Sequence, residues 1–237
     1  PMLEHIESLL SGTGSALNLQ TFKLVDQLSG RTMGLRADTT PQVARIDAHL
    51  LNRTGLTRLC YCGPVLHTRP GGPFASREPL QLGAELYGHA GLEADLEILE
   101  LALQGLRLSG LSKSVLDLGD ARIVTTVLEG QDLSEEHRQA VLDALAAKDA
   151  QALQGLTQHL DADVAQALQF LVSAYGDAQV LTAARQALAA WPMALTALDD
   201  LTWLTRQLNQ PVMYDLADAR GYAYYSGVRF AIYVPQL

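Results

Sequence analysis

The residues of this chain that could do chemistry gather in three short segments, far apart in the sequence. The segments are Leu35-Arg-Ala-Asp-Thr-Thr40, Gln81-Leu-Gly-Ala-Glu85 and Arg220-Gly-Tyr-Ala-Tyr-Tyr-Ser-Gly227. Their candidate residues offer a fixed cation, two carboxylates, an amide and two phenols, from Arg220, Asp38, Glu85, Gln81, Tyr224 and Tyr225. A free amino acid, with its ammonium, its carboxylate and a polar side chain, needs about this set of partners. Only a folded sheet could bring such distant segments together, so we expect each to lie at the end of a strand.

Taken one at a time, each candidate residue also has an ordinary structural explanation. Asp38 precedes a predicted helix, where an aspartate commonly caps the helix or forms a turn. Gln81, Glu85 and Arg220 could be ordinary polar residues on an open sheet face or edge. Tyr224 and Tyr225 could simply pack in a sheet, because aromatic residues favour strands. The combination of the three segments, rather than any single residue, favours a ligand site.

Alternation along the second segment strengthens that interpretation. Gln81, Gly83 and Glu85 are two residues apart, so all three side chains point to one face of a strand. Gly83 would leave room there for a ligand to approach the backbone. Gly221 and Gly227 bracket the tyrosines of the third segment in the same way. The pattern is typical of a small-molecule site with an apolar floor and a few convergent polar groups.

The elements that would position these segments follow from hydrophobic periodicity and turn residues. In the first half we predict a hairpin at 21–36 and a helix at 39–50, which begins at Thr39 or Thr40 with Pro41 in its first turn. We also predict two strands, at 57–66 and 79–87, joined by a Gly/Pro-rich loop, and another helix at 92–106. One more strand is predicted at Val115–Leu118 and Arg122–Val124.

The composition changes near Gly130. Residues 132–208 are rich in Ala, Leu and Gln, which predicts several short helices, the first beginning with a capping box of Asp132 and Glu135. Strand character returns at 212–217 and 222–233, completing a sheet begun before the helices. This order predicts an α+β fold with an antiparallel sheet. We expect residues 1–130 to be the first part of the core domain, 131–210 a helical insertion and 211–237 the return to the sheet, with the last part of the domain missing.

Composition excludes several classes of protein. Of 237 residues, 48% are hydrophobic and 18% charged, which favours an ordered globular protein over disorder. No apolar run approaches the roughly 20 residues that span a bilayer, and no secretion signal is expected. A net charge of −9 counts against tight nucleic-acid binding. Cys60 and Cys62 alternate on one predicted strand, and we expect them to be buried, reduced thiols of a cytoplasmic protein rather than metal ligands.

Two longer stretches carry a family resemblance. Together with the three segments, Cys62-Gly-Pro-Val-Leu-His-Thr-Arg-Pro70 and Ser76-Arg-Glu-Pro-Leu-Gln-Leu-Gly-Ala-Glu-Leu-Tyr-Gly88 resemble the synthetase-like regulatory subunits of ATP phosphoribosyltransferase, relatives of histidyl-tRNA synthetase. The resemblance covers most of the chain and is least diagnostic in the helical stretch. It implies a class II aminoacyl-tRNA synthetase fold, with an antiparallel sheet flanked by helices, in a protein that is usually dimeric.

The resemblance also implies a role for each candidate residue in binding histidine. It places the α-ammonium near Asp38, Thr40 and Gln81, and Arg220 against the α-carboxylate, where a guanidinium can pair in a two-pronged way. The imidazole would be held by Glu85 and Tyr225, with Tyr224 also counted among the binding residues. One departure is Asp38, where synthetases carry the longer Glu.

Other departures predict that aminoacylation is lost. In synthetases an arginine that grips the ATP α-phosphate stands at the position of His67, and this chain stops before a second such arginine. Losing one preorganised charge-stabilising group costs on the order of 10²–10³ in rate. We therefore expect no catalytic residue, no cofactor and no metal ion in this chain.

The sequence thus predicts a non-catalytic, histidine-binding regulatory subunit of ATP phosphoribosyltransferase. It would pair with the short catalytic subunit, form a homodimer, permit activity and relay feedback inhibition, without binding a membrane or, we expect, tRNA. The loop Pro70–Ser76 and the region near Arg220 are expected to move. Two alternatives stay open: a fragment of a true histidyl-tRNA synthetase catalytic domain, and a structural protein that uses the fold only to oligomerise.

Overall fold

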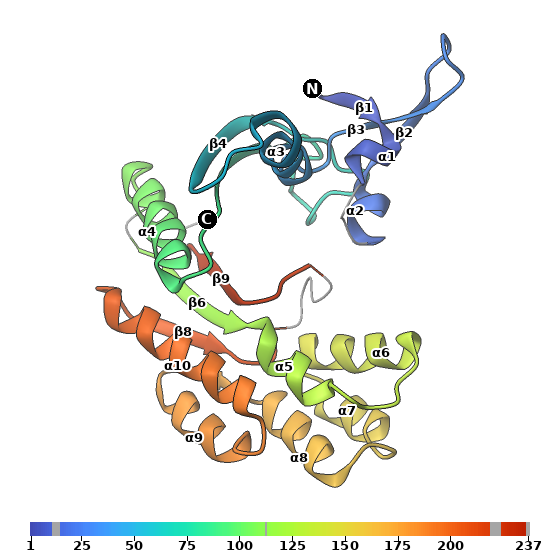
Figure 1. Ribbon diagram of the computed structural model, residues 1–237. Helices are drawn as coiled ribbons and strands as arrows, with labels where there is room; N and C mark the ends of the chain where they lie inside the picture. Colours follow the sequence, from blue (N-terminus) through green and yellow to red (C-terminus); the bar gives the residue numbers. More distant parts are fainter. Residues whose placement is uncertain (11–14, 112, 219–223, 236–237) are drawn as a thin grey trace. The chain divides into compact units, whose positions relative to one another are not determined.

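The computed structural model describes residues 1–10, 15–111, 113–218 and 224–235 (Figure 1). The chain forms two compact units, Pro1–Ala94 and Asp95–Leu237, and each is described by itself. The domain boundaries predicted near residues 130 and 210 concern the insertion and remain a prediction. Among the described residues, no helix is long and apolar enough to cross a membrane.

The first unit begins with a small antiparallel sheet. Its strands are β1 (Leu3–His5), β2 (Phe22–Val25) and β3 (Thr32–Leu35), in the order β1-β3-β2. The turn between β2 and β3 is closed by the Asp26 carboxylate, which accepts hydrogen bonds from the Leu28 and Ser29 amides. Gly30 takes a φ of +69°, which a glycine adopts at little cost. The predicted hairpin is confirmed.

Short helices and a second pair of strands complete this unit. The helices are α1 (Ile6–Leu9), α2 (Ser15–Gln20), α3 (Thr40–Arg45) and the π-helix η1 (Ile46–Leu51). The strands β4 (Thr57–Pro64) and β5 (Leu80–Tyr87) pair antiparallel. Pro41 lies in the first turn of α3, where its missing N–H costs no hydrogen bond. The helix after Asp38 and the two strands are therefore confirmed.

The two faces of the β4–β5 pair differ. One face carries Gln81, Gly83 and Glu85, as predicted, and the register places Tyr61 opposite Gly83. On the other face Leu80 and Leu82 are 71% and 76% exposed. Cys60 and Cys62 are also exposed, so the prediction of buried thiols is wrong, although both do alternate on one strand. An apolar strand does not by itself show which of its faces is covered.

The second unit is built on a four-stranded sheet with β6 (Val115–Asp120) inside it. The order is β7-β8-β6-β9, and the other strands are β7 (Tyr175–Gly176), β8 (Val212–Asp215) and β9 (Val228–Tyr233). Strand β9 runs antiparallel to β6, whereas β8 runs parallel to it. A parallel neighbour requires a long crossover, which the helices between β6 and β8 provide. The predicted return to a sheet begun before the helices is confirmed.

Helices make up most of the remaining residues. They are α4 (Leu92–Leu108), α5 (Ala121–Leu128), α6 (Glu135–Ala146), α7 (Ala150–Leu156), α8 (Ala162–Leu171), α9 (Gln179–Ala187) and α10 (Pro192–Gln207). The capping box predicted at Asp132 is wrong, because Ser134 is the N-cap of α6 and its hydroxyl accepts from the His137 amide. Ser134 is also followed three residues later by a histidine rather than by the acid that the pattern requires.

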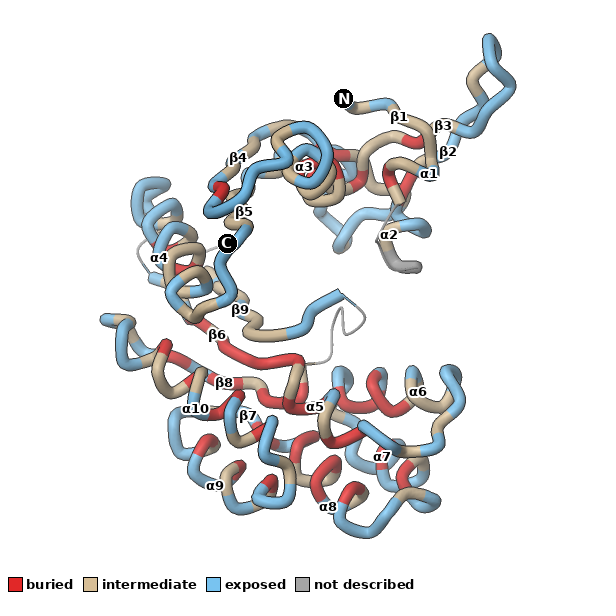
Figure 2. The backbone as a smooth tube through the Cα atoms, viewed as in Figure 1, coloured by how far each residue is buried: buried red, intermediate tan, exposed pale blue. Residues whose placement is uncertain are grey.

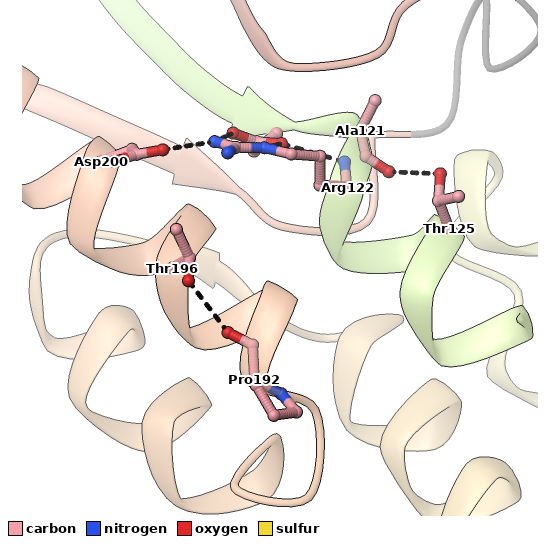
Figure 3. Close-up of polar contacts among 7 residues, drawn as sticks. Ala121, Arg122, Thr125, Pro192, Thr196 and Asp200 are labelled. Carbon is pink, nitrogen blue, oxygen red and sulfur yellow. Dashed lines mark hydrogen bonds and ion pairs between the residues drawn. The ribbon is translucent and has the colours of Figure 1, made fainter. Parts of the chain in front are cut away.

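The strand predicted at Arg122–Val124 is wrong, because these residues lie in α5. Asp120 ends β6 and caps the helix, since its carboxylate accepts from the Arg122 amide at 2.9 Å. The Arg122 guanidinium donates back to Asp120 and to Asp200 of α10, the second contact at 2.7 Å (Figure 3). Apolar side chains at helical spacing, including Ile123 and Val127, are fully buried.

The main hydrophobic core lies in the second unit. Its buried residues come from α4, β6, the helices α5 to α10 and β8 (Figure 2). Helix α10 packs against α5, α9 and β6. The described part of the first unit buries few apolar side chains, among them Leu9, Val43 and Val65. The candidate residues Gln81 and Glu85 therefore lie on a lightly covered strand pair rather than inside a large core.

Candidate functional site

The first unit brings four of the predicted site residues together. The Gln81 side chain on β5 accepts from the Thr39 amide at 2.9 Å through Oε1 and donates to Asp38 Oδ1 at 2.8 Å through Nε2. Asp38 Oδ1 also accepts from the Thr40 amide at 3.1 Å. These bonds tie the strand to the turn that starts α3. They also leave Asp38 Oδ2 without a hydrogen bond among the described residues, so this oxygen can receive a ligand's donor.

Glu85 is the second acceptor of this group. The Tyr87 hydroxyl, two residues along the same face of β5, donates to Glu85 Oε2. Glu85 Oε1 is buried and has no hydrogen-bond partner in the described part of the chain. Burial raises the pKa of the Glu85 carboxyl above its ordinary value, and hydrogen bonds from Tyr87 and Thr40 oppose this effect only in part. A buried carboxylate oxygen without a donor is costly, so a ligand N–H would be favoured there.

Tyr61 is a member of the group that the sequence analysis missed. Its hydroxyl lies 3.2 Å from Thr40 Oγ1, and its ring covers the backbone of Gly83, where an added Cβ would stand 2.2 Å from Tyr61 Cζ. The prediction that Gly83 leaves space for a ligand is therefore wrong. The space beside this glycine is filled by the Tyr61 ring. Burial, followed by the charges of Glu85 and Asp38, raises the pKa of the Tyr61 phenol. The signal was present in the sequence, because pairing β4 with β5 sets Tyr61 against Gly83.

The predicted residues of the third segment belong to the second unit. Tyr224 and Tyr225 are 56% and 43% exposed, and their rings meet edge to face with centroids 5.1 Å apart. The Arg229 guanidinium carbon lies 4.5 Å from the centroid of the Tyr225 ring. Arg220, predicted to hold a carboxylate, lies outside the described residues, as does Gly221. Of the strand predicted from residue 222, Val228–Tyr233 form β9, whereas the described residues 224–227 are not in a strand.

His67 follows β4 and is held by the backbone. Its Nε2 lies 3.0 Å from the carbonyl oxygen of Ala37, and because a carbonyl only accepts, this nitrogen carries the hydrogen. The His67 amide donates to the Arg77 carbonyl, and Arg77 Nε donates to the His67 carbonyl at 3.1 Å. Arg77 also lies over the Phe22 ring, with 4.8 Å from Cζ to the centroid. The His67 ring thus joins the segment after β4 to the segment before α3.

The polar groups of the first unit are of the kinds that bind a small ligand. The first-unit residues offer carboxylate oxygens, hydroxyls and an amide, which suit a small polar ligand with N–H donors. Among the described residues, no group of three or more His, Cys, Asp and Glu could hold a metal ion. Asp38, Thr40, Gln81 and Glu85 are thus brought together as predicted, with Tyr61 and Tyr87 added.

Comparison with known proteins places the chain in a family. The family model described as histidyl-tRNA synthetase matches residues 1–237. The chain belongs to the histidyl-tRNA synthetase family. A member of that family from Albidiferax ferrireducens, named ATP phosphoribosyltransferase regulatory subunit, is 61% identical over 234 residues. These residues cover 98% of this chain and 61% of the relative, so the chain spans about three fifths of its relative's length.

Solved structures of the family confirm the fold. The structure named ATP phosphoribosyltransferase regulatory subunit/histidyl-tRNA synthetase from Bacillus halodurans matches with a TM-score of 0.85 at 28% identity, over 100% of this chain and 63% of that one. The ATP phosphoribosyl transferase complex from Thermotoga maritima matches with a TM-score of 0.66 at 19% identity, over 100% of this chain and 80% of that one, which concerns the fold alone. The predicted α+β, class II synthetase-like fold with helices flanking an antiparallel sheet is confirmed.

Proposed function

We propose that this chain is part of a non-catalytic regulatory subunit of ATP phosphoribosyltransferase. It binds L-histidine, permits the activity of a short catalytic subunit and relays feedback inhibition to it, in the first step of histidine biosynthesis. The name and 61% identity of the Albidiferax ferrireducens relative support the regulatory role. We further propose that the subunit is cytoplasmic and forms a homodimer besides its complex with the catalytic subunit.

The observation that carries the ligand proposal is the arrangement around Glu85. One carboxylate oxygen is held by Tyr87, and the other is buried without a donor among the described residues. An imidazole N–H supplies such a donor, and a neighbouring phenol fixes which ring nitrogen carries it. The α-ammonium would meet Asp38 Oδ2, Thr40 and Gln81, which the turn before α3 already holds in place. The resemblance assigns Arg220, Tyr224 and Tyr225 to the same ligand.

A non-catalytic role is supported by His67. Its Nε2–H is engaged with the Ala37 carbonyl, so this side chain does not offer a phosphate the two-pronged guanidinium that an arginine would. Regulation then requires that histidine bind one conformation of the assembly more tightly than another, because equal affinity shifts no equilibrium. The loop Pro70–Ser76 remains a part that we propose to move, whereas the prediction for the segment around Arg220 falls on residues outside the described ranges.

Calorimetric titration of L-histidine into the full-length protein tests this function. We expect micromolar-range binding, which corresponds to roughly 8 kcal/mol. Glu85→Ala and Arg220→Ala should each weaken it at least about tenfold, because the first leaves the imidazole N–H without its acceptor and the second leaves the α-carboxylate without its cation. Glu100→Ala, an exposed acid on α4, is the matched control and should bind like the parent.

The regulatory part needs the catalytic subunit. Adding the protein should raise the ATP phosphoribosyltransferase activity of that subunit, and histidine should then lower it, with Glu85→Ala insensitive to histidine. Activation without any histidine binding by the parent would leave only the scaffold role. Binding that survives both Glu85→Ala and Arg220→Ala would show that the ligand site lies elsewhere.

A further inference from the structure

Arg229 is held in place more firmly than a strand-edge arginine usually is. It lies on β9, opposite Gly119 of β6, and its Nη1 is 3.1 Å from Asp218 Oδ1 and donates to the Asp218 carbonyl at 2.9 Å. The side chains of Arg229 and Asp218 are only 14% and 13% exposed. A charge-assisted contact and a carbonyl from the same residue together fix the plane of the guanidinium.

The surroundings of Arg229 explain why it stays there. The shallow hollow beside it is lined by the acids Asp117, Asp215 and Asp218. Lys148 pairs with Asp215, and Arg229 pairs with Asp218. Gly119 lets the Asp215 carbonyl oxygen come close to its backbone, because a Cβ at this position would lie only 2.7 Å from that oxygen. The acidic lining favours the guanidinium in this position over one extended into solvent.

The fixed guanidinium in turn holds an aromatic ring. Its carbon lies 4.5 Å from the centroid of Tyr225, within the range of a cation–π contact. The Tyr224 ring packs against Tyr225 edge to face, at an interplanar angle of 88°. A tyrosine that is 43% exposed would otherwise choose among several rotamers, and these two contacts select one.

We propose that Arg229 is a positioning residue that holds the phenol of Tyr225 ready for the ligand. The inference rests on the proposed function, which assigns Tyr225 to the imidazole of histidine. Arg229 itself need not touch the ligand: Asp218 anchors the guanidinium, the guanidinium orients the ring, and the ring presents its hydroxyl. Affinity is gained because the ring does not have to be ordered when the ligand binds.

A double-mutant cycle on histidine affinity tests the inference. Arg229→Met keeps a long apolar side chain over the ring and removes the charge, so we expect affinity to fall about fivefold. Arg229→Lys, which keeps the charge, should recover part of the loss. In a Tyr225→Phe background the hydroxyl to be positioned is gone, so adding Arg229→Met should change affinity less than about twofold. An equal loss in both backgrounds would mean a merely structural role and would overturn the inference.

A second readout does not depend on the ligand. In protein labelled with 3-fluorotyrosine, the ¹⁹F signal that disappears in Tyr225→Phe identifies this ring. Arg229→Met should shift and sharpen that signal, while the signal of Tyr87 in the first unit stays unchanged. An unmoved Tyr225 signal would overturn the inference whatever the ligand does. If the parent bound no histidine, the proposed function would fail separately, and this spectrum would still decide whether Arg229 orients Tyr225.

Discussion

Gly83 shows how one residue can support two interpretations until its neighbours are known. Between Gln81 and Glu85, a glycine suggests space for a ligand, and the strand alternation supports that idea. In the structure the space is filled by Tyr61, whose ring covers the glycine from the paired strand. A cross-strand aromatic over a glycine is a recognised way to stabilise a sheet. Because the Tyr61 ring fills this space, we expect a ligand to contact the hydroxyl of Tyr61 rather than the Gly83 backbone.

Replacing Gly83 by alanine tests this packing. The new methyl group would overlap the end of the Tyr61 ring, which must swing away and lose its contact with Thr40. We expect the free energy of unfolding to fall by about 1 kcal/mol, the contribution of one hydrogen bond. Gly105→Ala on α4, with no neighbour within 4 Å, is the control and should gain about 0.5–1 kcal/mol. Urea unfolding measures both, and equal effects would contradict the packing of Tyr61 on Gly83.

The Glu85 carboxyl predicts a dependence of stability on pH. Its pKa in the folded protein is raised by burial above the ordinary value of 4.5, which the unfolded chain retains. Between these two values the folded state binds more protons than the unfolded state, so the free energy of unfolding falls as pH rises through the window. Glu85→Gln cannot ionise and lacks this fall. Urea unfolding from about pH 4 to about pH 7 should therefore show the variant gaining stability relative to the parent. A difference that is the same at every pH would rule out this titration.

At the scale of elements, the start of α5 shows how a cap can outweigh strand propensity. The sequence Arg-Ile-Val-Thr-Thr-Val is rich in β-branched residues, which favour strands. Asp120 nevertheless caps a helix there, and the resulting spacing buries Ile123, Val124 and Val127 in the core. Arg122 forms ion pairs with both Asp120 and Asp200, and so links the start of α5 to α10. These two carboxylates raise the pKa of the Arg122 guanidinium. One buried carboxylate thus ends a strand, begins a helix and joins two helices.

Two substitutions at Asp120 separate these roles. Asp120→Ala removes the cap and one partner of Arg122, and we expect a loss of about 2–4 kcal/mol in the free energy of unfolding. Asp120→Asn keeps an oxygen that can cap the helix and should lose clearly less. Asp199→Ala, which breaks the exposed pair with Arg185, is the control and should change stability by less than about 1 kcal/mol. Chemical denaturation measures all three, and an equal loss for the two Asp120 variants would argue against capping.

At the scale of the molecule, the large hydrophobic core and the hydrogen-bonded group of candidate residues lie in different units of the described chain. The large core lies in the second unit, whereas the described first unit holds the hydrogen-bonded group of Asp38, Thr40, Gln81 and Glu85. A lightly covered strand pair can be reshaped by a ligand at lower cost than a strand inside a large core. This division fits a protein that binds and signals.

The absence of aminoacylation is a prediction about the whole protein. With a histidine rather than an arginine at position 67, the full-length protein should show no histidine-dependent exchange between ATP and pyrophosphate, although we expect it to bind histidine. An active histidyl-tRNA synthetase assayed in parallel is the positive control. Exchange above background would support the alternative of a synthetase catalytic domain, and the regulatory proposal would then have to be abandoned.

The sequence alone determined the hairpin, most of the strands and helices, the α+β class and the membership of Asp38, Thr40, Gln81 and Glu85 in one group. The elements follow from local periodicity, from turn residues and from alternation along a strand, all of which act over a few neighbouring residues, whereas the grouping of these four residues was implied by the family resemblance. Only the tertiary structure decided that Arg122–Val124 is helical, that Cys60 and Cys62 are exposed, that Tyr61 covers Gly83 and that Arg229 holds Tyr225. Each of these depends on which distant residue packs against a given side chain, and local propensity carries no information about that choice.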